Sequence, residues 1–422
     1  MVTVTSAAEA LAALNGWWTT GTISAKLARP YRRKAFAEAL RLLNEHRQIL
    51  MLTGIRRVGK STMLYQLIQT LLESVPPKNI IYFNFDAGSS GLLALLGEYQ
   101  RITGIDWKNE RVYLFLDEVQ KHYGWSSQAK MLYDAFPNLK ITVSGSASLQ
   151  LESRAADDLT GRYFRVDMKP LSIIEYYELR TGKVVERPEL YMSELRSEAD
   201  RYMLRQFPEV VSWENDADIK QYIRESVIAK ITRSDLPDTF KDVNFRLLEA
   251  MISSFFSRPG MIISVDTLSK EYSISKTTLE NHLFYMEFSR LIRVVRNFRP
   301  SIRMESRKLR KVYPYNIALA LSMHAAEPQY ALETAAASRI DASNYWRMGA
   351  REVDFITREP LLPIEVKSGN RVRPEDMGSV RYFMDRFGAK DAVIIYNGNH
   401  KSNVGGIRLL PFADFLVEGI SH

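Results

Sequence analysis

The chain has 422 residues, of which 46% are hydrophobic and 25% charged, as in an ordinary soluble protein with several domains. It contains no cysteine, which excludes disulfides, thiolate metal sites and cysteine nucleophiles and fits a reducing cytoplasm. The net charge is +8, and neither a signal peptide nor a membrane-spanning apolar run is apparent, so we expect a cytoplasmic protein that does not enter a membrane.

Short apolar strands alternate with helices along the N-terminal part of the chain, after a helical stretch over residues 1–45. We predict strands over residues 49–52, 80–85, 112–116, 141–143 and 163–166. Such alternation is typical of a parallel sheet with helices on both faces. The sequence therefore predicts an α/β domain over residues 1–170.

A phosphate-binding loop, the P-loop, joins the first strand to the next helix. It reads Gly54-Ile-Arg-Arg-Val-Gly59-Lys60-Ser61-Thr62. The glycines let backbone N–H groups turn toward a phosphate at a helix N-terminus, where the helix dipole favours anions. Lys60 would reach the terminal phosphates and Ser61 would hold Mg²⁺. The alternative is a glycine turn in a structural loop. The predicted nucleotide-binding residues here are Gly54, Arg57, Val58, Gly59, Lys60, Ser61 and Thr62.

Two acids, Asp117 and Glu118, end the third predicted strand. Asp117 would hold Mg²⁺ through water, and Glu118 would orient and activate the attacking water, because phosphoryl transfer depends mainly on positioning and charge neutralisation. An ordinary strand that ends in a solvated acidic turn is the alternative. Combined with the P-loop, in this order, the acids predict an ATPase in which Lys60 and Glu118 are catalytic.

Hydroxyls and arginines follow the fourth strand. Ser144 or Ser146 would lie beside the terminal phosphate and sense it, unless the segment is a plain Ser/Gly turn. Arg154 or Arg162 would act as an arginine finger supplied to a neighbouring subunit, with a surface ion pair as the alternative.

The middle of the chain is predicted to contain two regions. Residues 171–240 look mostly helical and are expected to form a helical lid or linker. After them come three amphipathic helices, the third capped by Ser275, and then a basic β-branched stretch over residues 291–295. This order outlines a winged helix over residues 241–327. Winged helices bind either DNA or protein, and both remain candidate partners of this domain.

Basic residues concentrate in the same region. One acid, Glu305, faces nine basic residues in this window, which predicts a basic stripe and a polyanion such as DNA as partner. The alternative is a solvated basic surface. The stripe consists of Arg290, Arg293, Arg296, Arg299, Arg303, Arg307, Lys308, Arg310 and Lys311.

The C-terminal part combines carboxylates and a lysine on a predicted hairpin. A turn between Glu359 and Pro360 would place Asp354 opposite Glu365. Alternation would place these acids, Glu352 and Lys367 on one face and the apolar residues Val353, Phe355, Ile364 and Val366 on the other. Opposed carboxylates repel each other, and Mg²⁺ or Mn²⁺ between them would remove the conflict. The alternative is a solvated polar face with a Glu352–Lys367 ion pair.

Several motifs together resemble one family. The P-loop, Leu-Phe-Leu-Asp117-Glu118-Val-Gln120, Leu159-Thr-Gly-Arg162 and Ile364-Glu-Val-Lys-Ser-Gly369 are similar to motifs of the uncharacterised prokaryotic AAA+ ATPases that carry a C-terminal domain of unknown function. The resemblance implies an AAA+ module, a winged helix and a nuclease-like fold, and it implies a homo-oligomer because AAA+ modules commonly form rings.

The C-terminal acid and lysine spacing resembles the PD-(D/E)XK nuclease core. The resemblance implies a restriction-endonuclease-like α/β domain over residues 328–422, with Asp354, Glu365 and Lys367 as catalytic residues. It also implies Glu333 as a metal ligand beside Asp354 and Glu365. The leading hypothesis is an ATP-driven enzyme that remodels or processes DNA, including branched DNA. The alternative is a nucleotide-dependent switch that binds a partner protein and has an inactive nuclease fold.

Overall fold

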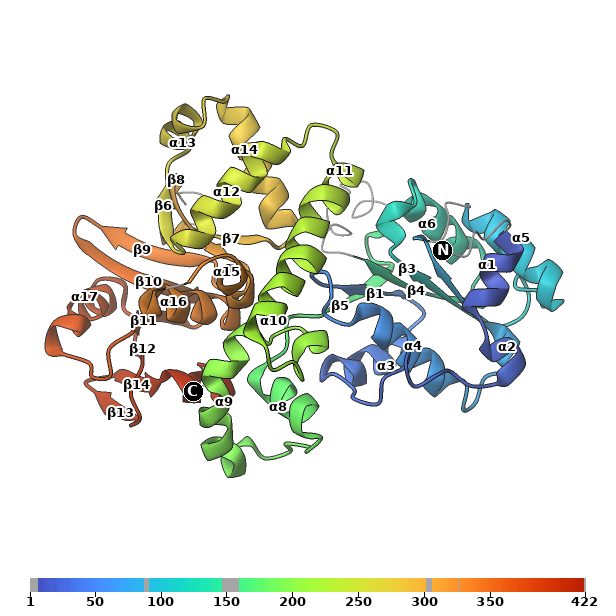
Figure 1. The fold of residues 1–422 in the computed structure, drawn as a ribbon, viewed down its shortest axis with the longest axis horizontal. Helices are drawn as coiled ribbons and strands as arrows, with labels where there is room; N and C mark the ends of the chain where they lie inside the picture. The colour runs from blue at the N-terminus through green and yellow to red at the C-terminus, as the bar shows by residue number, and fades with distance from the viewer. Residues whose placement is uncertain (1–6, 87–90, 146–158, 301–305, 326, 421–422) are drawn as a thin grey trace. The chain divides into compact units, whose positions relative to one another are not determined.

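The computed structural model describes residues 7–86, 91–145, 159–300, 306–325 and 327–420 (Figure 1). It consists of two compact units, Met1–Lys169 and Pro170–His422. Among the helices in these ranges, none combines the length and the apolar character that crossing a membrane requires.

The first unit contains a parallel sheet with the strand order β2-β3-β4-β1-β5. Helices α3 and α4 lie on one side of the sheet, and α5 and α6 on the other (Figure 1). The prediction of a parallel α/β domain is confirmed. The strands are β1 (Ile49–Thr53), β2 (Ile80–Asn84), β3 (Val112–Asp117), β4 (Leu139–Gly145) and β5 (Tyr163–Asp167). The helices are α1 (Ala7–Leu14), α2 (Trp17–Thr20), α3 (Ala35–Glu45), α4 (Lys60–Leu71), α5 (Leu92–Thr103) and α6 (Trp125–Ala135).

The edge strand β2 is covered by side chains from the N-terminal helices. The Asn15 amide donates to the Tyr82 carbonyl at 2.8 Å and accepts from the Tyr82 N–H at 2.7 Å, as a neighbouring strand would. The indole N–H groups of Trp17 and Trp18 both donate to the Ile80 carbonyl. Because edge strands expose unpaired backbone groups, these contacts close the edge and hold β2 in place.

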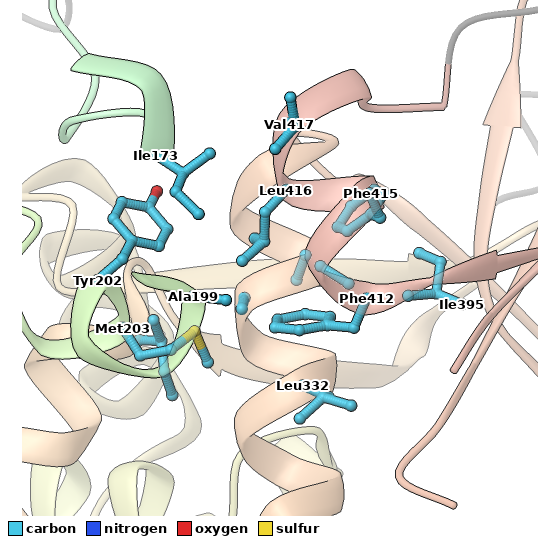
Figure 2. Packing of buried hydrophobic residues seen from close by; sticks show 14 of the residues in the cluster. Ile173, Ala199, Tyr202, Met203, Leu332, Ile395, Phe412, Phe415, Leu416 and Val417 are labelled. Carbon is cyan, nitrogen blue, oxygen red and sulfur yellow. The ribbon is translucent and has the colours of Figure 1, made fainter. Parts of the chain in front are cut away.

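The second unit begins with helices that pack on the C-terminal end of the chain. Figure 2 shows Ala199, Tyr202 and Met203 of α9 close to Phe412 and Leu416 of α18, within one hydrophobic cluster. A bidentate ion pair joins the same helices, because the Arg196 guanidinium donates to both Asp414 oxygens at 2.6 and 2.9 Å. The helices of this part are α8 (Ile173–Thr181), α9 (Met192–Leu204), α10 (Asp216–Ile223) and α11 (Leu236–Thr239), and α18 (Phe412–Glu418) ends the described chain.

Three helices follow, as the sequence predicts, and with them three strands, of which β6 is not predicted by the sequence. Ser275 caps the third helix by accepting from the Thr278 N–H at 3.0 Å. The buried face of the first helix contains Leu248, Met251 and Phe255. The elements are α12 (Phe245–Ser257), β6 (Met261–Ile263), α13 (Val265–Glu271), α14 (Lys276–Phe288), β7 (Ile292–Asn297) and β8 (Ser306–Pro314).

These strands belong to one nine-stranded sheet with the order β13-β14-β12-β11-β10-β9-β7-β8-β6. The parallel pairing of β7 with β9 joins the three-strand part to the C-terminal strands. Side chains of β8 therefore enter the same core as those of β10 and β11. The remaining elements are α15 (Ile317–Met323), α16 (Pro328–Arg339), β9 (Asn344–Met348), β10 (Arg351–Arg358), β11 (Leu361–Lys367), α17 (Gly378–Phe387), β12 (Ala392–Tyr396), β13 (Ser402–Val404) and β14 (Ile407–Pro411).

The hairpin of β10 and β11 has the predicted register. Phe355 pairs with Ile364 and Arg358 with Leu361, so the turn lies where the sequence places it. The predicted apolar face is wrong at one position. A register shift on the β9 side of β10 moves Val353 into a different hydrophobic cluster from Phe355 and Ile364. A bulge of this kind reverses the alternation of side chains, which strand periodicity does not reveal.

Candidate nucleotide site and C-terminal acid cluster

The P-loop leaves β1 through a glycine that has no room for a side chain. A Cβ on Gly54 would lie 2.4 Å from the Met168 carbonyl oxygen, just after β5. The loop ends at Gly59, whose φ of 99° is in the left-handed region, and α4 begins at Lys60. Both glycines are thus required by the backbone path, and the loop delivers its N–H groups to a helix N-terminus.

Lys60 lies inside this loop. Its ammonium donates to the Gly54 carbonyl at 3.1 Å and to the Ile55 carbonyl at 3.3 Å, and the side chain is buried. Ser61 and Thr62 occupy the first turn of α4 and are partly exposed, whereas Val58 is buried and Arg57 is exposed with a positive φ. The residue types and the helix N-terminus fit a nucleotide phosphate.

Arg33 stabilises the P-loop through hydrogen bonds to backbone carbonyls, a role that the sequence did not predict. Its guanidinium donates to the Val58 carbonyl at 3.0 Å and to the Lys169 carbonyl at 2.8 Å. These bonds connect the middle of the P-loop to the chain after β5. The Arg29-Pro-Tyr-Arg-Arg33 segment gives no sign of this role, because its partners are backbone groups far along the chain.

Asp117 ends β3 in full burial and accepts three hydrogen bonds. Tyr82 on β2 donates its hydroxyl to Oδ2 at 2.9 Å, Ser144 on β4 donates its hydroxyl to Oδ1, and the Glu118 N–H donates to Oδ1 at 3.1 Å. Burial, and then the negative charge of Asp117, raises the pKa of Tyr82 far above its ordinary value, so the phenol keeps its proton. Asp117 is therefore a carboxylate oriented from both neighbouring strands.

Tyr82 is an orienting residue on β2. Its side chain is buried, and its hydroxyl contacts Asp117. A buried tyrosine must find a hydrogen-bond partner, and the strand beside the acidic one offers a carboxylate. Glu118 follows Asp117 with a φ of 53°, and its carboxylate accepts from the Gln120 amide.

The remaining predicted residues of the first unit are spread apart. Ser146 and Arg154 lie outside the described residues. Arg162 precedes β5 and forms a two-pronged ion pair with Asp134 of α6, at 2.9 and 3.1 Å. Its carbonyl accepts from the Ile49 N–H, so Arg162 lies at the start of β1 and the P-loop at the end of that strand.

The C-terminal acids meet at the end of the β10–β11 hairpin. Asp354 Oδ2 accepts from the Val366 N–H at 2.9 Å, and Glu365 Oε2 accepts from the Asp354 N–H at 3.4 Å. Lys367 donates to Glu365 Oε1 at 2.7 Å. The structure therefore brings the predicted Asp354, Glu365 and Lys367 together.

Glu333 of α16 joins this group through neutral donors. Tyr313 of β8 donates to its Oε2 at 3.1 Å, and Gln329 donates to its Oε1 at 2.7 Å. Gln329 also donates to the Val366 carbonyl at 2.8 Å and so connects α16 to β11. We call Lys311, Glu333, Glu352, Asp354, Glu365 and Lys367 the acid cluster.

Lys311 is the member of the acid cluster that sequence reasoning assigned elsewhere. It projects from β8, is 4% exposed, and places its ammonium 2.5 Å from Glu352 Oε1 and 3.4 Å from Asp354 Oδ1. Burial alone would lower the pKa of Lys311, but the Tyr313 oxygen and the Asp354 and Glu352 carboxylates raise it well above the ordinary value. The ammonium stays charged.

Burial raises the pKa of an acid, whereas it lowers the pKa of a lysine. Burial, and then the negative charge of Asp354, raises the pKa of Glu365 to about 8 and that of Glu333 to about 7. Across the described ranges, no group of three or more histidine, aspartate or glutamate residues is arranged to hold a metal ion. The predicted Glu352–Lys367 ion pair is wrong, because Glu352 pairs with Lys311 and Arg347, and Lys367 pairs with Glu365.

The basic stripe is not a continuous exposed surface. Arg293 pairs with Asp341 at 2.6 Å, Arg310 pairs with Glu280 at 3.2 Å, and Lys311 enters the acid cluster. Arg290 is buried against the Tyr315 ring. Arg303 and the side chains of Arg307 and Lys308 lie outside what the structure describes. Charge spacing predicted a surface, but the partner acids come from distant segments that spacing does not reveal.

The P-loop and the oriented acid lie at one edge of the first sheet, which supports a P-loop nucleotide-binding domain. Residues 46–177 match the model of an AAA domain. Residues 196–330 and 329–415 match two domains of unknown function, DUF8612 and DUF4143. With the relatives below, these matches support an uncharacterised AAA+ ATPase family.

The curated relatives are themselves uncharacterised. The chain is 26% identical over 234 residues to "Uncharacterized protein MJ1637" of Methanocaldococcus jannaschii, which covers 55% of this chain and 48% of that protein. It is 25% identical over 237 residues to an uncharacterized protein of Haemophilus influenzae, which covers 56% of this chain and 57% of that protein. The matched segment thus spans about half the length of these relatives.

Two solved structures overlap with parts of the chain. One is the Aeropyrum pernix ORC1 protein in complex with DNA, with 12% identity, a TM-score of 0.34, and coverage of 70% of this chain and 92% of that chain. The other is Pif1 helicase from Candida albicans, with 15% identity, a TM-score of 0.26, and coverage of 39% and 48%. Overlaps of this quality define neither a shared fold nor a shared function.

Proposed function

We propose that the first unit hydrolyses ATP with Mg²⁺. The observation that supports this most is that the P-loop, which follows β1, and Asp117 and Glu118, at the end of β3, lie at the same edge of a parallel sheet with β4 between them. Such an edge, outside the carboxyl ends of the strands, is where open α/β sheets bind ligands.

Each residue then has a defined role. Lys60 would exchange its two loop carbonyls for the terminal phosphates, and Ser61, in the first turn of α4, would hold the metal ion. Asp117, held by Tyr82 and Ser144, presents an oriented carboxylate, and Glu118 positions the attacking water. Bound Mg²⁺ would neutralise charge that develops on the phosphates.

ATP turnover by point variants tests this assignment. Lys60→Ala should abolish nucleotide binding, whereas Glu118→Gln should retain binding and lose about 100-fold or more in turnover, as expected when a water-positioning group is removed. The exposed Lys26→Ala is the matched control and should leave both unchanged. Full turnover by Glu118→Gln would contradict the role of Glu118.

A homo-oligomer would complete this site. Arg162 lies at the opposite end of β1 from the P-loop, about 15 Å away for a five-residue strand, so it can serve only a neighbouring subunit. Arg162→Ala should then lower turnover without weakening ATP binding, and turnover should rise with protein concentration. Unchanged turnover would leave Arg162 as a partner of Asp134 alone.

We further propose that DNA is the substrate on which ATP is used. Support comes from the net charge of +8 and from helix α14, whose first turn exposes Lys276 and Thr277 beside two strands, as in winged helices. The Lys276–Asp266 ion pair is exposed on both sides and so contributes little. DNA should stimulate turnover with a steep salt dependence. Lys276→Ala should weaken that stimulation, and Lys270→Ala, exposed on α13, should not.

One observation favours the second candidate, a nucleotide-dependent switch with an inactive nuclease fold. The carboxylates of the acid cluster are already matched by donors of the chain itself. In that case turnover would be indifferent to duplex, single-stranded and four-way-junction DNA, and no DNA would be cut with Mg²⁺ or Mn²⁺.

A further inference from the structure

The acid cluster has donors on every carboxylate oxygen of the three residues that a metal ion would need. Asp354 accepts from Lys311 and from the Val366 N–H, at 3.4 and 2.9 Å. Glu365 accepts from Lys367 and from the Asp354 N–H, at 2.7 and 3.4 Å. Glu333 accepts from Gln329 and Tyr313, at 2.7 and 3.1 Å. Each carboxylate oxygen of these three acids therefore already has one partner that belongs to the chain itself.

Glu352 extends the same pattern. Its Oε1 lies 2.5 Å from the Lys311 ammonium and its Oε2 lies 3.5 Å from the Arg347 guanidinium. Lys311 thus bridges two carboxylates from a position 4% exposed, with its ammonium 5.4 Å from the centre of the Tyr345 ring. A buried ammonium held by two carboxylates and an aromatic face is a cation site whose cation belongs to the chain.

We propose that Lys311 is a built-in cation that replaces a divalent metal ion in the acid cluster, and that the cluster therefore stabilises the second unit instead of cleaving nucleic acid. Mg²⁺ requires near-octahedral oxygen ligands at about 2.1 Å. The Lys311 ammonium already supplies a positive charge beside Glu352 and Asp354, where such an ion would bind. The residues present do not fit a metal ion while Lys311 is in place.

Lys311 reaches the acid cluster from another strand of the same sheet. Lys311 lies opposite Val295 in the β7–β8 ladder, and β7 pairs with β9, so the ammonium is delivered by the same continuous sheet that carries Asp354. Withdrawing the Lys311 ammonium would remove a positive charge from both Glu352 and Asp354. The proposal concerns only the second unit and is independent of ATP hydrolysis.

Binding of Mn²⁺ to nucleotide-free protein, measured by electron paramagnetic resonance, tests the proposal. Wild-type protein and Asp354→Asn should bind Mn²⁺ alike, because the cluster takes none. Lys311→Met, which keeps the length of the side chain and removes its charge, should gain an additional Mn²⁺ site per chain. The double variant Lys311→Met/Glu365→Gln should lose that site. Lys270→Met, an exposed lysine on α13, is the matched control and should behave as wild type.

Thermal unfolding gives a second readout. Lys311→Met should melt at a lower temperature than wild type, and Mn²⁺ should restore the loss only in that variant. Wild-type binding of one Mn²⁺ that Asp354→Asn abolishes would overturn the proposal, whether or not Lys311→Met folds. A folded Lys311→Met that binds no more Mn²⁺ than wild type would also overturn it. Because neither assay contains nucleotide, both results are separate from a failure of the proposed ATPase.

Discussion

At the scale of single residues, the proposed nucleotide site contains side chains that hold its motif residues in place. Tyr82 and Ser144 reach Asp117 from the two strands beside β3, and Arg33 holds the P-loop through the Val58 carbonyl. None of the three supports carries the chemistry itself. Their effect is to fix the carboxylate and the loop before a nucleotide arrives, which lowers the cost of ordering them on binding.

The Tyr82 hydroxyl can be removed without changing the shape of the core. Tyr82→Phe leaves Asp117 Oδ2 without its donor at 2.9 Å, so the carboxylate should be less well oriented toward Mg²⁺. We expect a loss of about 1–2 kcal/mol in unfolding free energy and a higher Mg²⁺ concentration for half-maximal turnover. Tyr99→Phe loses a hydrogen bond from the hydroxyl to the Lys78 carbonyl. It should lose a similar amount of unfolding free energy, and its Mg²⁺ concentration for half-maximal turnover should be unchanged.

Two glycines of the first unit should respond oppositely to the same substitution. Gly54→Ala places a methyl group 2.4 Å from the Met168 carbonyl and should displace the P-loop and abolish ATP binding. Gly97→Ala, in the middle of α5 with open space around it, should raise the unfolding free energy by about 0.5–1 kcal/mol. Calorimetric titration and chemical denaturation measure the two effects. Normal ATP affinity in Gly54→Ala would contradict the close approach.

Lys140 predicts a pH dependence of stability. Burial, and then the charge of Arg111, lowers the pKa of Lys140 from 10.5 to about 8. Below pH 8 the lysine is charged in both the folded and the unfolded state, and the burial of this charge destabilises the folded state. This destabilisation disappears as the pH rises toward 10.5. Relative to Lys140→Met, wild-type protein should therefore gain up to about 3 kcal/mol over this interval. A pH-independent difference in denaturation would contradict this.

At the scale of elements, the two sheets differ in what lies along an edge. In the first unit the edge strand β2 is paired by a side chain, because Asn15 exchanges two hydrogen bonds with the Tyr82 backbone. In the second unit the short strand β6 continues the sheet beyond β8. The covered edge of β2 matters for function, since β2 carries the hydroxyl that orients Asp117.

Asn15→Ala tests the covered edge. It leaves the Tyr82 N–H and carbonyl without partners in a buried position, so we expect a loss of about 2–3 kcal/mol in unfolding free energy and reduced ATP turnover. Asn138→Ala removes one exposed hydrogen bond to the Asn109 carbonyl and should cost less than about 1 kcal/mol, with normal turnover. Equal losses in the two variants would argue against a special role for Asn15.

At the scale of the whole molecule, the chain divides after Lys169 into two compact units. The second unit is held together by segments far apart in the sequence. Asp414 of α18 is fully buried and bound by Arg196 of α9, and the surrounding cluster joins α9, α16 and α18 (Figure 2). Its stability therefore depends on the last helix of the described chain.

Asp414→Ala should destabilise the second unit selectively. It removes two charged hydrogen bonds from the half-exposed Arg196, and we expect a loss of about 1.5–3 kcal/mol. ATP stabilises only the state that binds it, so it should still raise the melting temperature of the first unit in this variant. Differential scanning calorimetry with and without ATP separates the two effects. Loss of the ATP-induced shift would show that the units do not fold independently.

Much of this protein follows from local sequence. The apolar runs that define the five parallel strands, the P-loop, the acids after β3, the cap at Ser275 and the register of the β10–β11 hairpin all depend on residues close together in the chain. Strand periodicity, glycine conformation and capping are short-range effects, so their patterns can be read without coordinates.

Only the tertiary structure decided which distant groups meet. It placed the Tyr82 hydroxyl on Asp117, moved Lys311 from an apparent basic stripe into the acid cluster, and shifted Val353 by a bulge. Lys311 and Asp354 are 43 positions apart and meet because β7 pairs with β9. Composition records how many charges a chain carries, whereas the pairing of strands determines which of them neutralise one another inside the fold.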